Sequence, residues 1–461
     1  MLDRDAALGA LQIAQKGGAD FAEVFMEDTE STALSMVGGK MENAQNGRIF
    51  GAGVRVMRGV TAAYAYTNDV SRSGLARAAE QAAAALDAQA GSPEEIAFQV
   101  KGDGRAIWAQ LLPGRVAGAE KAALVREADR AARDISPEIV QVSCGYSDVD
   151  QRIWVCNTAG VFAQDRRVRV RLAVQAVASD GQQNQTGFEG PGAAMGFEAF
   201  RTRIDPAMAA QTAARTAVTM LHARECPAGR FPVAIDSGFG GVIFHEACGH
   251  SLEATSVAKG ASVFCGMRGK PIAAPCVTAI DDGTLPGEWG SAAMDDEGNP
   301  TQRVVLIENG ILKNYLVDRL GGRRMGMEPT GCGRRQSYRF APTSRMSNTF
   351  IAPGESTDEE IIASIDKGLY AKKMGGGSVN PVTGDFNFAV QEGYWVKNGR
   401  IQDAVRGATL IGKGAEVLMK IDKVGGALAL GQGMCGSLSG SVPTNVGQPM
   451  IRVSSITVGG R

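Results

Sequence analysis

Residues 243–254 read IFHEACGHSLEA and hold two of the chain's three histidines, His245 and His250, on either side of Glu246. A helix that carries HExxH presents two imidazoles to one metal ion and a glutamate to the attacking water. Here the spacing is one residue longer, which on a regular α-helix would point the two imidazoles roughly 140° apart. We therefore predict a wide π-type turn or a break at Gly249.

The spacing alone leaves two interpretations of this stretch open. The histidines could be core residues of an ordinary buried helix, or they could bind a metal ion. The composition favours the metal, because the whole chain of 461 residues has only 3 histidines. A chain that nearly avoids histidine gains little from two in one apolar turn unless imidazole chemistry is required there.

Three motifs extend the argument beyond this stretch: HEACGHSLEA from residue 245, RMSNTFIAPG from residue 345, and GQGMCGSLSGSVPTNVGQPMIRVSSITVGG from residue 431. Together they resemble the TldD/PmbA family of zinc metallopeptidases, and the resemblance runs through the whole chain. In that family the TldD-type subunit carries HExxxH, which the PmbA-type partner (TldE) lacks. His245, Glu246 and His250 match the motif, so the chain resembles the TldD-type subunit. The resemblance also implies Cys435 as the third ligand of one zinc ion (Zn2+) per chain.

The residues by themselves do not select the third ligand, which zinc needs if a fourth position is to stay open. Glu253 has the reach of a helical carboxylate, but it could equally orient a histidine from behind. Cys248 would crowd three donors onto one turn, and Asp236 is more simply explained as a helix cap. Cys435 is preferred on the resemblance.

Roles follow from the chemistry that zinc supplies to a peptidase. Glu246 would act as the general base, taking the proton of the attacking water and passing it to the leaving amine. Arg345, Asn348 and Thr349, with a flexible loop at 375–377, are candidate substrate contacts. The alternative is that these are surface turn residues. Exposed backbone in a β-rich half would bind an extended peptide by strand addition.

Two further patterns are predicted to be accidental. Residues 431–436, GQGMCG, match GxGxxG, but a dinucleotide-binding loop must open a helix, and SLSGSVPTN is not helical. Residues 436–440, GSLSG, place Leu438 where a serine hydrolase needs its nucleophile.

Composition excludes several classes of protein. The formal charge of −1, from 48 basic and 49 acidic residues, provides no broad basic surface for nucleic acid. The N-terminal MLDRDAALGALQIAQ lacks the features of a signal peptide, and no apolar stretch approaches the ~18 residues of a membrane span, so we predict a cytoplasmic protein. The 8 cysteines form no CxxC pair, which argues against a disulfide framework or a zinc ribbon.

Periodicity predicts an α+β fold in which helix–antiparallel strands–helix units are duplicated and a β-rich domain follows. The predicted domains are 1–110, 111–225 and 226–461. The predicted N-terminal helices are 3–16, 71–88, 118–135 and 205–222. The predicted N-terminal strands are 20–26, 31–37, 51–56, 60–67, 139–146, 152–157 and 168–178. His222, in the last turn of its helix, is assigned a structural role.

The metal helix is predicted at the junction of the two halves. It would follow a strand at 231–235 and an N-capping turn at 236–238. Asn-Gly pairs at 309–310 and 398–399 predict hairpins. A capping box at 357–360 predicts one more helix, ending at Gly368.

The resemblance implies a peptidase that acts on unfolded or small peptides, including leader peptides of modified peptide antibiotics. Two other hypotheses remain: a non-catalytic binding or regulatory subunit, and a thiol-based metal store or redox sensor. The scattered cysteines disfavour the last. We expect a homodimer, or a heterodimer with a PmbA/TldE-type subunit, that encloses the active site. Such a dimer would also cover exposed sheet edges, and the family pairs its subunits around a central tunnel.

Overall fold

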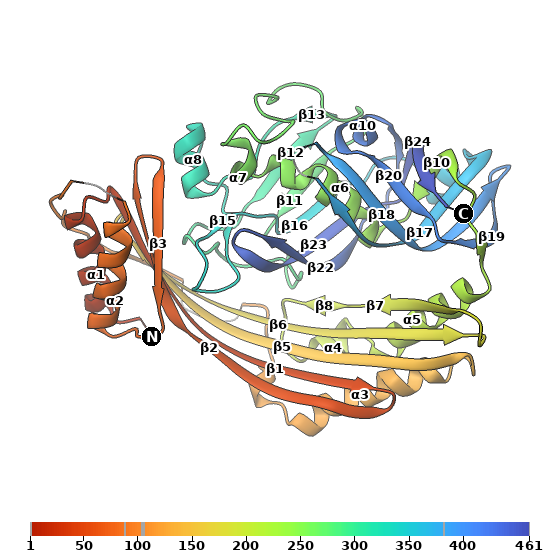
Figure 1. The fold of residues 1–461 in the computed structure, drawn as a ribbon, viewed down its shortest axis with the longest axis horizontal. Coiled ribbons are helices and arrows are strands. Elements are labelled where there is room, and N and C mark those ends of the chain that lie inside the picture. Colours follow the sequence, from red (N-terminus) through yellow and green to blue (C-terminus); the bar gives the residue numbers. More distant parts are fainter. Residues whose placement is uncertain (1, 87–88, 103–106, 381–382, 461) are drawn as a thin grey trace.

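The N-terminal half is built on one long, curved sheet (Figure 1). The computed structural model describes residues 2–86, 89–102, 107–380 and 383–460. The sheet has the strand order β3-β2-β1-β5-β6-β4, and β7 and β8 also pair with β6. These strands are β1 (Phe21–Val37), β2 (Lys40–Arg58), β3 (Thr61–Thr67), β4 (Gln99–Lys101), β5 (Ile139–Asn157), β6 (Val161–Ser179), β7 (Asn184–Glu189) and β8 (Gly192–Ala193).

The central strands are longer than predicted, because the expected breaks at 27–30 and 147–151 do not occur. Strands β1 and β5 pair without interruption from Glu23–Asn157 to Val37–Ser143. The polar residues that suggested a break have partners in the fold. The Glu27 carboxylate accepts a hydrogen bond from the Tyr338 amide at 2.8 Å, and Asp28 pairs with Arg48 at 2.7 Å. Strands from both predicted N-terminal units therefore lie in one sheet, and the duplication and domain limits stay predictions.

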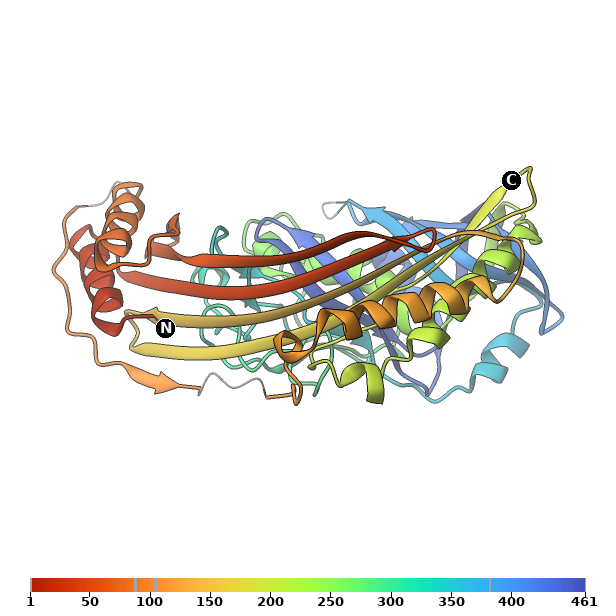
Figure 2. The ribbon, with the colours of Figure 1, turned by 90° about the horizontal axis from the view of Figure 1, so that it is seen from below.

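Helices cover two regions of this sheet. Helices α1 (Arg4–Lys16) and α2 (Arg72–Ala84) pack at one end, with an apolar cluster that includes Leu11 and Leu75. Residues 87–88 of the predicted second helix lie outside the described residues. Helices α3 (Gly118–Arg133) and α5 (Pro206–Leu221) lie across the outer face of the strands, as Figure 2 shows. The short α4 (Ala199–Thr202) precedes α5.

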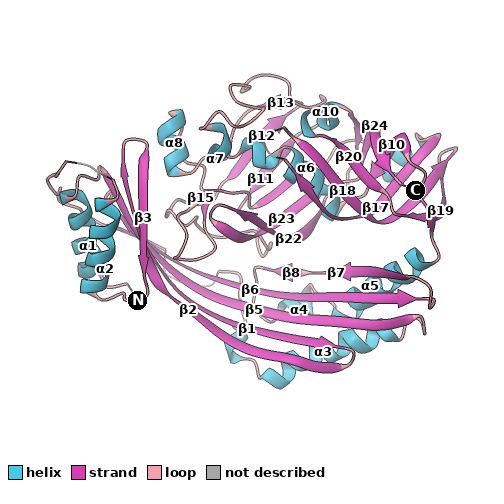
Figure 3. Cartoon of the chain, viewed as in Figure 1, coloured by secondary structure: helices cyan, strands magenta, loops and turns pink. Residues whose placement is uncertain are grey.

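The C-terminal half contains two larger sheets (Figure 3). In the first, five strands pair in a closed ring, β17-β10-β24-β20-β18 and back to β17, and β19, β9 and β21 extend it. Its strands are β9 (Arg224–Glu225), β10 (Gly229–Ile235), β17 (Lys367–Val379), β18 (Asp385–Lys397), β19 (Arg400–Arg406), β20 (Thr409–Lys413), β21 (Ile421–Val424) and β24 (Ile451–Gly459). The chain as a whole is a strand-rich α+β protein.

The second sheet of this half has the order β13-β12-β11-β16-β23-β22, so β22 is an edge strand. Its strands are β11 (Ala279–Asp282), β12 (Arg303–Glu308), β13 (Ile311–Leu312), β16 (Asn348–Ile351), β22 (Ala429–Ser437) and β23 (Gly440–Gln448). The remaining short elements are β14 (Gly333–Arg334), β15 (Thr343–Ser344), α7 (Ala254–Val257), α8 (Arg319–Met325), α9 (Asp358–Ala363) and α10 (Gly414–Met419). No helix among the described residues has the length and apolar character that a membrane crossing requires.

Of the local features predicted in this half, the turns and the capping box form, but the helix end at Gly368 does not. Both Asn-Gly turns form, with Asn309 and Asn398 at φ 50° between paired strands. The capping box at Thr357 is also present. Helix α9, however, ends at Ala363, and Gly368 lies inside β17. The helix thus ends before Gly368, which belongs instead to the strand that pairs with β10 and β18.

The two halves contact each other through arginines on β6. Arg167 pairs with Asp296 at 2.6 Å, and Arg169 donates to the carbonyls of Trp289 and Ser291 at 3.0 Å. These side chains project from one face of β6 because alternate residues of a strand point the same way. The C-terminal half is thereby held against the long sheet (Figure 1).

Candidate metal centre

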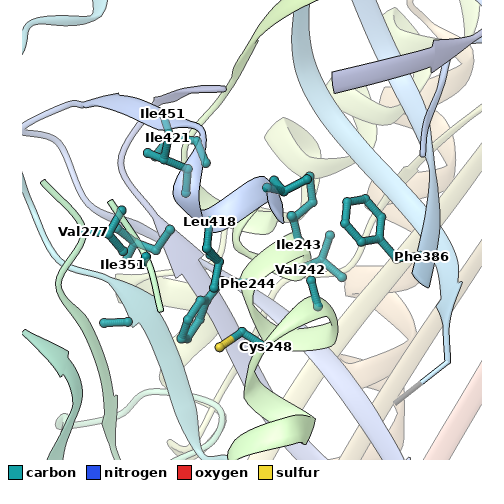
Figure 4. Close-up of a cluster of buried hydrophobic side chains, with 14 of the residues drawn as sticks. Val242, Ile243, Phe244, Cys248, Val277, Ile351, Phe386, Leu418, Ile421 and Ile451 are labelled. Atoms are coloured by element: carbon teal, nitrogen blue, oxygen red, sulfur yellow. The ribbon is translucent and has the colours of Figure 1, made fainter. Parts of the chain in front are cut away.

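The HEACGH stretch begins as a short helix in the core of the C-terminal half. Strand β10 leads through a 3-10 turn at Gly238–Gly241 into α6 (Val242–Ala247). Val242, Ile243 and Phe244 anchor this helix in the apolar cluster drawn in Figure 4, and all three are buried. The expected N-cap does not form. The Asp236 carboxylate instead accepts hydrogen bonds from the Ser237 amide and the Tyr370 hydroxyl.

The helix breaks between the two histidines, and no π-type turn forms. Cys248 leaves the α conformation at φ −130°, and a 3-10 helix at Gly249–Leu252 follows. Gly249 packs closely against Met346, because a Cβ at 249 would lie 2.3 Å from the Met346 sulfur and would displace that side chain. The break brings the His245 and His250 rings to 5.0 Å between centroids, at an interplanar angle of 81°.

Strand β22 brings Cys435 to the two histidines from 190 residues further along the chain. Its Sγ lies 3.3 Å from His245 Nε2 and 3.4 Å from His250 Nε2. These three atoms lie within 4.8 Å of one another, and the described residues contain no other such group of three His, Cys, Asp or Glu side chains. The structure thus brings together the three residues that were expected to bind the metal.

The donor set suits a zinc ion. Zn–N distances of about 2.0–2.1 Å and a Zn–S distance of about 2.3 Å place tetrahedral donors roughly 3.5 Å apart, close to the separations found here. Burial alone would raise the pKa of the Cys435 thiol, but the charges and hydrogen bonds of His245 and His250 lower that pKa to about 4. The sulfur is therefore a thiolate near neutral pH, which is the form that binds metal.

Glu253 orients His250 from behind. Its carboxylate lies 3.2 Å from His250 Nδ1, which leaves Nε2 directed at Cys435. Burial would lower the pKa of His250, but the charge of Glu253 and the contact with Cys435 raise it well above its usual value. His245 Nδ1 is buried and has no hydrogen-bond partner among the described residues. Glu253 is thus a supporting residue and not a member of the three-atom group.

Glu246 lies beside the cluster and is more open than the ligand candidates. Its carboxylate is 3.7 Å from His250 Nε2, and its side chain is 29% exposed. It borders a cavity of about 430 Å³ that His250 also lines. Residues that line the rest of this cavity were not predicted from the sequence, and they include Thr255, Ser256, Val379 and Leu438. No local pattern marks them, because the fold collects them from three separate segments.

Three other features of the sequence have structural explanations. Cys248 is fully buried among apolar side chains (Figure 4), and this burial raises the pKa of its thiol. His222 caps α5, and its Nε2 lies 2.9 Å from Glu138. Residues 431–436 form part of an edge strand and not a loop that opens a helix, so they do not form a dinucleotide site.

The predicted substrate contacts require correction. Arg345, Asn348 and Thr349 have no exposed surface. Thr349 donates to Asp281 at 2.6 Å, and Asn348 donates to the Asp282 carbonyl at 2.6 Å, so both hold β16 to β11. Residues 375–377 belong to an irregular part of β17 and not to a loop. The polar character that suggested a binding surface instead satisfies buried backbone and carboxylate groups.

Comparison with known proteins adds three family-model matches, all to the PmbA/TldA metallopeptidases. Domain 1 matches residues 22–86, the central domain matches residues 112–221, and the C-terminal domain matches residues 228–460. A curated relative, a metalloprotease TldD homologue of Haemophilus influenzae, is 34% identical over 100% of this chain and 97% of its own length.

Two other proteins are informative. A zinc metalloprotease TldD homologue of Saccharolobus solfataricus is 33% identical over 50% of this chain and 52% of its own length. The crystal structure of TldE from Thermococcus kodakarensis superposes with a TM-score of 0.77 at 18% identity, covering 99% of this chain and 100% of that one. At that identity the likeness shows the fold alone.

Proposed function

The chain belongs to the PmbA/TldD metallopeptidase family, and from that premise we propose that it is a zinc-dependent peptidase that cleaves unfolded or small peptides. Membership makes it a peptidase that uses a metal. The identity of the metal, the ligands, the general base and the substrate class are our proposals. One zinc ion per chain would be held by His245, His250 and Cys435.

One observation carries the proposal. Two imidazole nitrogens and a thiolate sulfur converge within 4.8 Å at the edge of a cavity that Glu246 lines. Three protein ligands leave one position open, which distinguishes catalytic zinc sites from structural ones. The name of the Saccharolobus solfataricus relative, a zinc metalloprotease, agrees with the choice of metal.

The residues of this chain would divide the chemistry as follows. Zinc held by His245, His250 and Cys435 would supply Lewis-acid chemistry, polarising a carbonyl and lowering the pKa of water. Glu246, next to the ligand His245 and partly exposed to the cavity, takes the proton of the attacking water and delivers it to the leaving amine. Glu253 keeps His250 in a fixed orientation through Nδ1.

The substrate we propose is a peptide in extended conformation. Strand β22 carries Cys435 and is the last strand of its sheet, so its outer edge has no strand partner among the described residues. Met434 and Leu438, on either side of Cys435, are 51% and 72% exposed. A peptide added to this edge would be bound mainly through its backbone, with little sequence preference. Leader peptides of modified peptides are one such class.

We also propose a dimer, with a second copy or with a TldE-type chain, that restricts access to the site. Strand β2 pairs with β3 only from Ala52 onward, so Lys40–Gly51 presents an unpaired edge among the described strands. Such an edge is an aggregation hazard unless a partner covers it. The likeness to TldE is consistent with a shared architecture of two such subunits. The cytoplasmic location stays a prediction.

Metal analysis and peptide cleavage by the wild type and Glu246→Gln test the proposal. We expect about one zinc per chain in both proteins and hydrolysis by the wild type only. Zinc without cleavage, in the presence of a TldE-type partner, would indicate the non-catalytic subunit instead. A wild-type chain that binds no metal would refute the proposed centre.

A further inference from the structure

Arg345 is the largest fully buried side chain of the described protein. Its Nη1 donates to the Ser439 hydroxyl at 3.0 Å and to the Gly440 carbonyl at 2.7 Å. Its Nη2 donates to the carbonyl oxygen of Cys435. All three acceptors belong to the hairpin of β22 and β23. Among the described residues, no Asp or Glu carboxylate forms a salt bridge with Arg345.

A buried guanidinium without a carboxylate partner costs stability, and here Nε also lacks a hydrogen-bond partner among the described residues. An apolar side chain of similar volume would fill the same space without that cost. The presence of an arginine at this buried position is therefore better explained by the geometry of its hydrogen bonds than by stability. Its planar fork can hold several acceptors in one fixed arrangement, which a lysine or a methionine cannot do.

The arrangement that it fixes is the turn that follows Cys435. Ser439 has no exposed surface, and its backbone carbonyl accepts a hydrogen bond from the backbone N–H of Gln336 at 2.8 Å. Gly440 adopts φ +83°, and a Cβ there would lie 2.5 Å from Gln336 Cβ. The turn is thus held between Arg345 and Gln336. Among the described strands β22 pairs with β23 alone, so these anchors, together with the Trp289 indole that donates to the Gly433 carbonyl at 2.9 Å, fix the place of Cys435.

We propose that Arg345 is the positioning residue for the metal ligand Cys435, an inference that rests on the proposed zinc site. It holds the carbonyl of the ligand residue itself, so that Sγ stays 3.3 and 3.4 Å from the two histidine nitrogens. Metal–ligand distances vary by only about 0.2 Å in real sites, so a small displacement of the hairpin weakens binding. The RMSN motif thereby serves the metal centre from behind the β22–β23 hairpin, without contact with substrate.

Arg345→Met and Arg345→Lys, with Arg334→Met as the matched control, test this role. Arg334 is also buried and donates to the Pro443 carbonyl at 2.7 Å, on the other strand of the same hairpin. Zinc affinity is measured by competition with a chelator, and the geometry at sulfur by the thiolate-to-cobalt absorption band of the Co²⁺ form. Urea unfolding of the metal-free proteins measures the structural effect.

We expect Arg345→Met to bind zinc about 10–100-fold more weakly, with a reduced or shifted cobalt band. Arg345→Lys keeps the positive charge but loses the planar fork. Its zinc affinity should therefore lie between those of Arg345→Met and the wild type. Arg334→Met should lose stability but keep zinc affinity within about threefold, which is well below the effect typical of groups that support a ligand.

Three results would overturn the inference. The first is an Arg345→Met protein with wild-type affinity and cobalt band, and the second is an equal loss of affinity in Arg334→Met. If Arg345→Met does not fold, wild-type affinity in Arg345→Lys refutes the role of the fork. In each case the wild type still binds zinc, so the proposed function survives. A wild type without metal would overturn both proposals.

Discussion

Replacing the two cysteines near the histidines one at a time should separate metal binding from folding stability. Cys435→Ser removes a thiolate whose Sγ lies 3.3 Å from His245 Nε2. Cys248→Ser changes a thiol that has no exposed surface and lies in the apolar cluster of Figure 4. The two substitutions are chemically identical and fall in or beside the same site.

The two substitutions should change different quantities: Cys435→Ser the zinc affinity, and Cys248→Ser the free energy of unfolding. Structural zinc is bound by about 10–16 kcal/mol over four ligands, so one ligand accounts for roughly 3 kcal/mol, or about a hundredfold in affinity. Cys435→Ser should lose that much affinity. Cys248→Ser should lose about 1–3 kcal/mol of unfolding free energy, because a hydroxyl is buried among apolar groups. Its zinc affinity should stay close to wild type.

The assay pairs chelator competition for zinc with urea unfolding of the metal-free proteins, so each variant gives one affinity and one stability. The crossed pattern is the diagnostic result, because a general loss of structure would lower both quantities together. If Cys248→Ser strips the metal while Cys435→Ser retains it, the ligand assignment is wrong.

Three further expectations concern the base, the support of His250 and the assembly. Glu246→Gln should lower peptide hydrolysis by about 10²–10⁴-fold at unchanged zinc content, and activity within tenfold of wild type would remove its role as general base. Glu253→Ala should weaken zinc binding about 10–100-fold because His250 loses its partner at Nδ1, and Glu253→Gln, which keeps an acceptor oxygen, should weaken it less. Equal affinity in all three proteins would contradict that role. Light scattering should give a dimer, alone or with a TldE-type chain, against a chain mass of 48.2 kDa, and a short unstructured peptide should be cleaved far faster than a folded protein that contains it. A monomer, or equal cleavage of both substrates, speaks against an enclosed site.

Some features follow from short-range chemistry and could be predicted from the sequence. The Asn-Gly turns form because asparagine and glycine tolerate positive φ, and the capping box forms because Thr357 and Glu360 satisfy each other's backbone amides. The break of the metal helix also follows locally, since two histidines spaced five positions apart do not fit one face of a regular helix. In each case the determining atoms lie within a few residues of one another.

Other features depend on contacts between distant segments. The polar residues at 27–30 suggested a break because their partners, Tyr338 and Arg48, are remote or on another strand. Arg345 and Thr349 resembled surface residues because the acceptors that make their burial possible lie in other strands. Sequence alone named Glu246 and the two histidines, but it could select Cys435 only through resemblance. The strand pairing that carries Cys435 across 190 residues to His245 exists only once the sheets have formed, because sheet register depends on the packing of whole faces and not on neighbours along the chain.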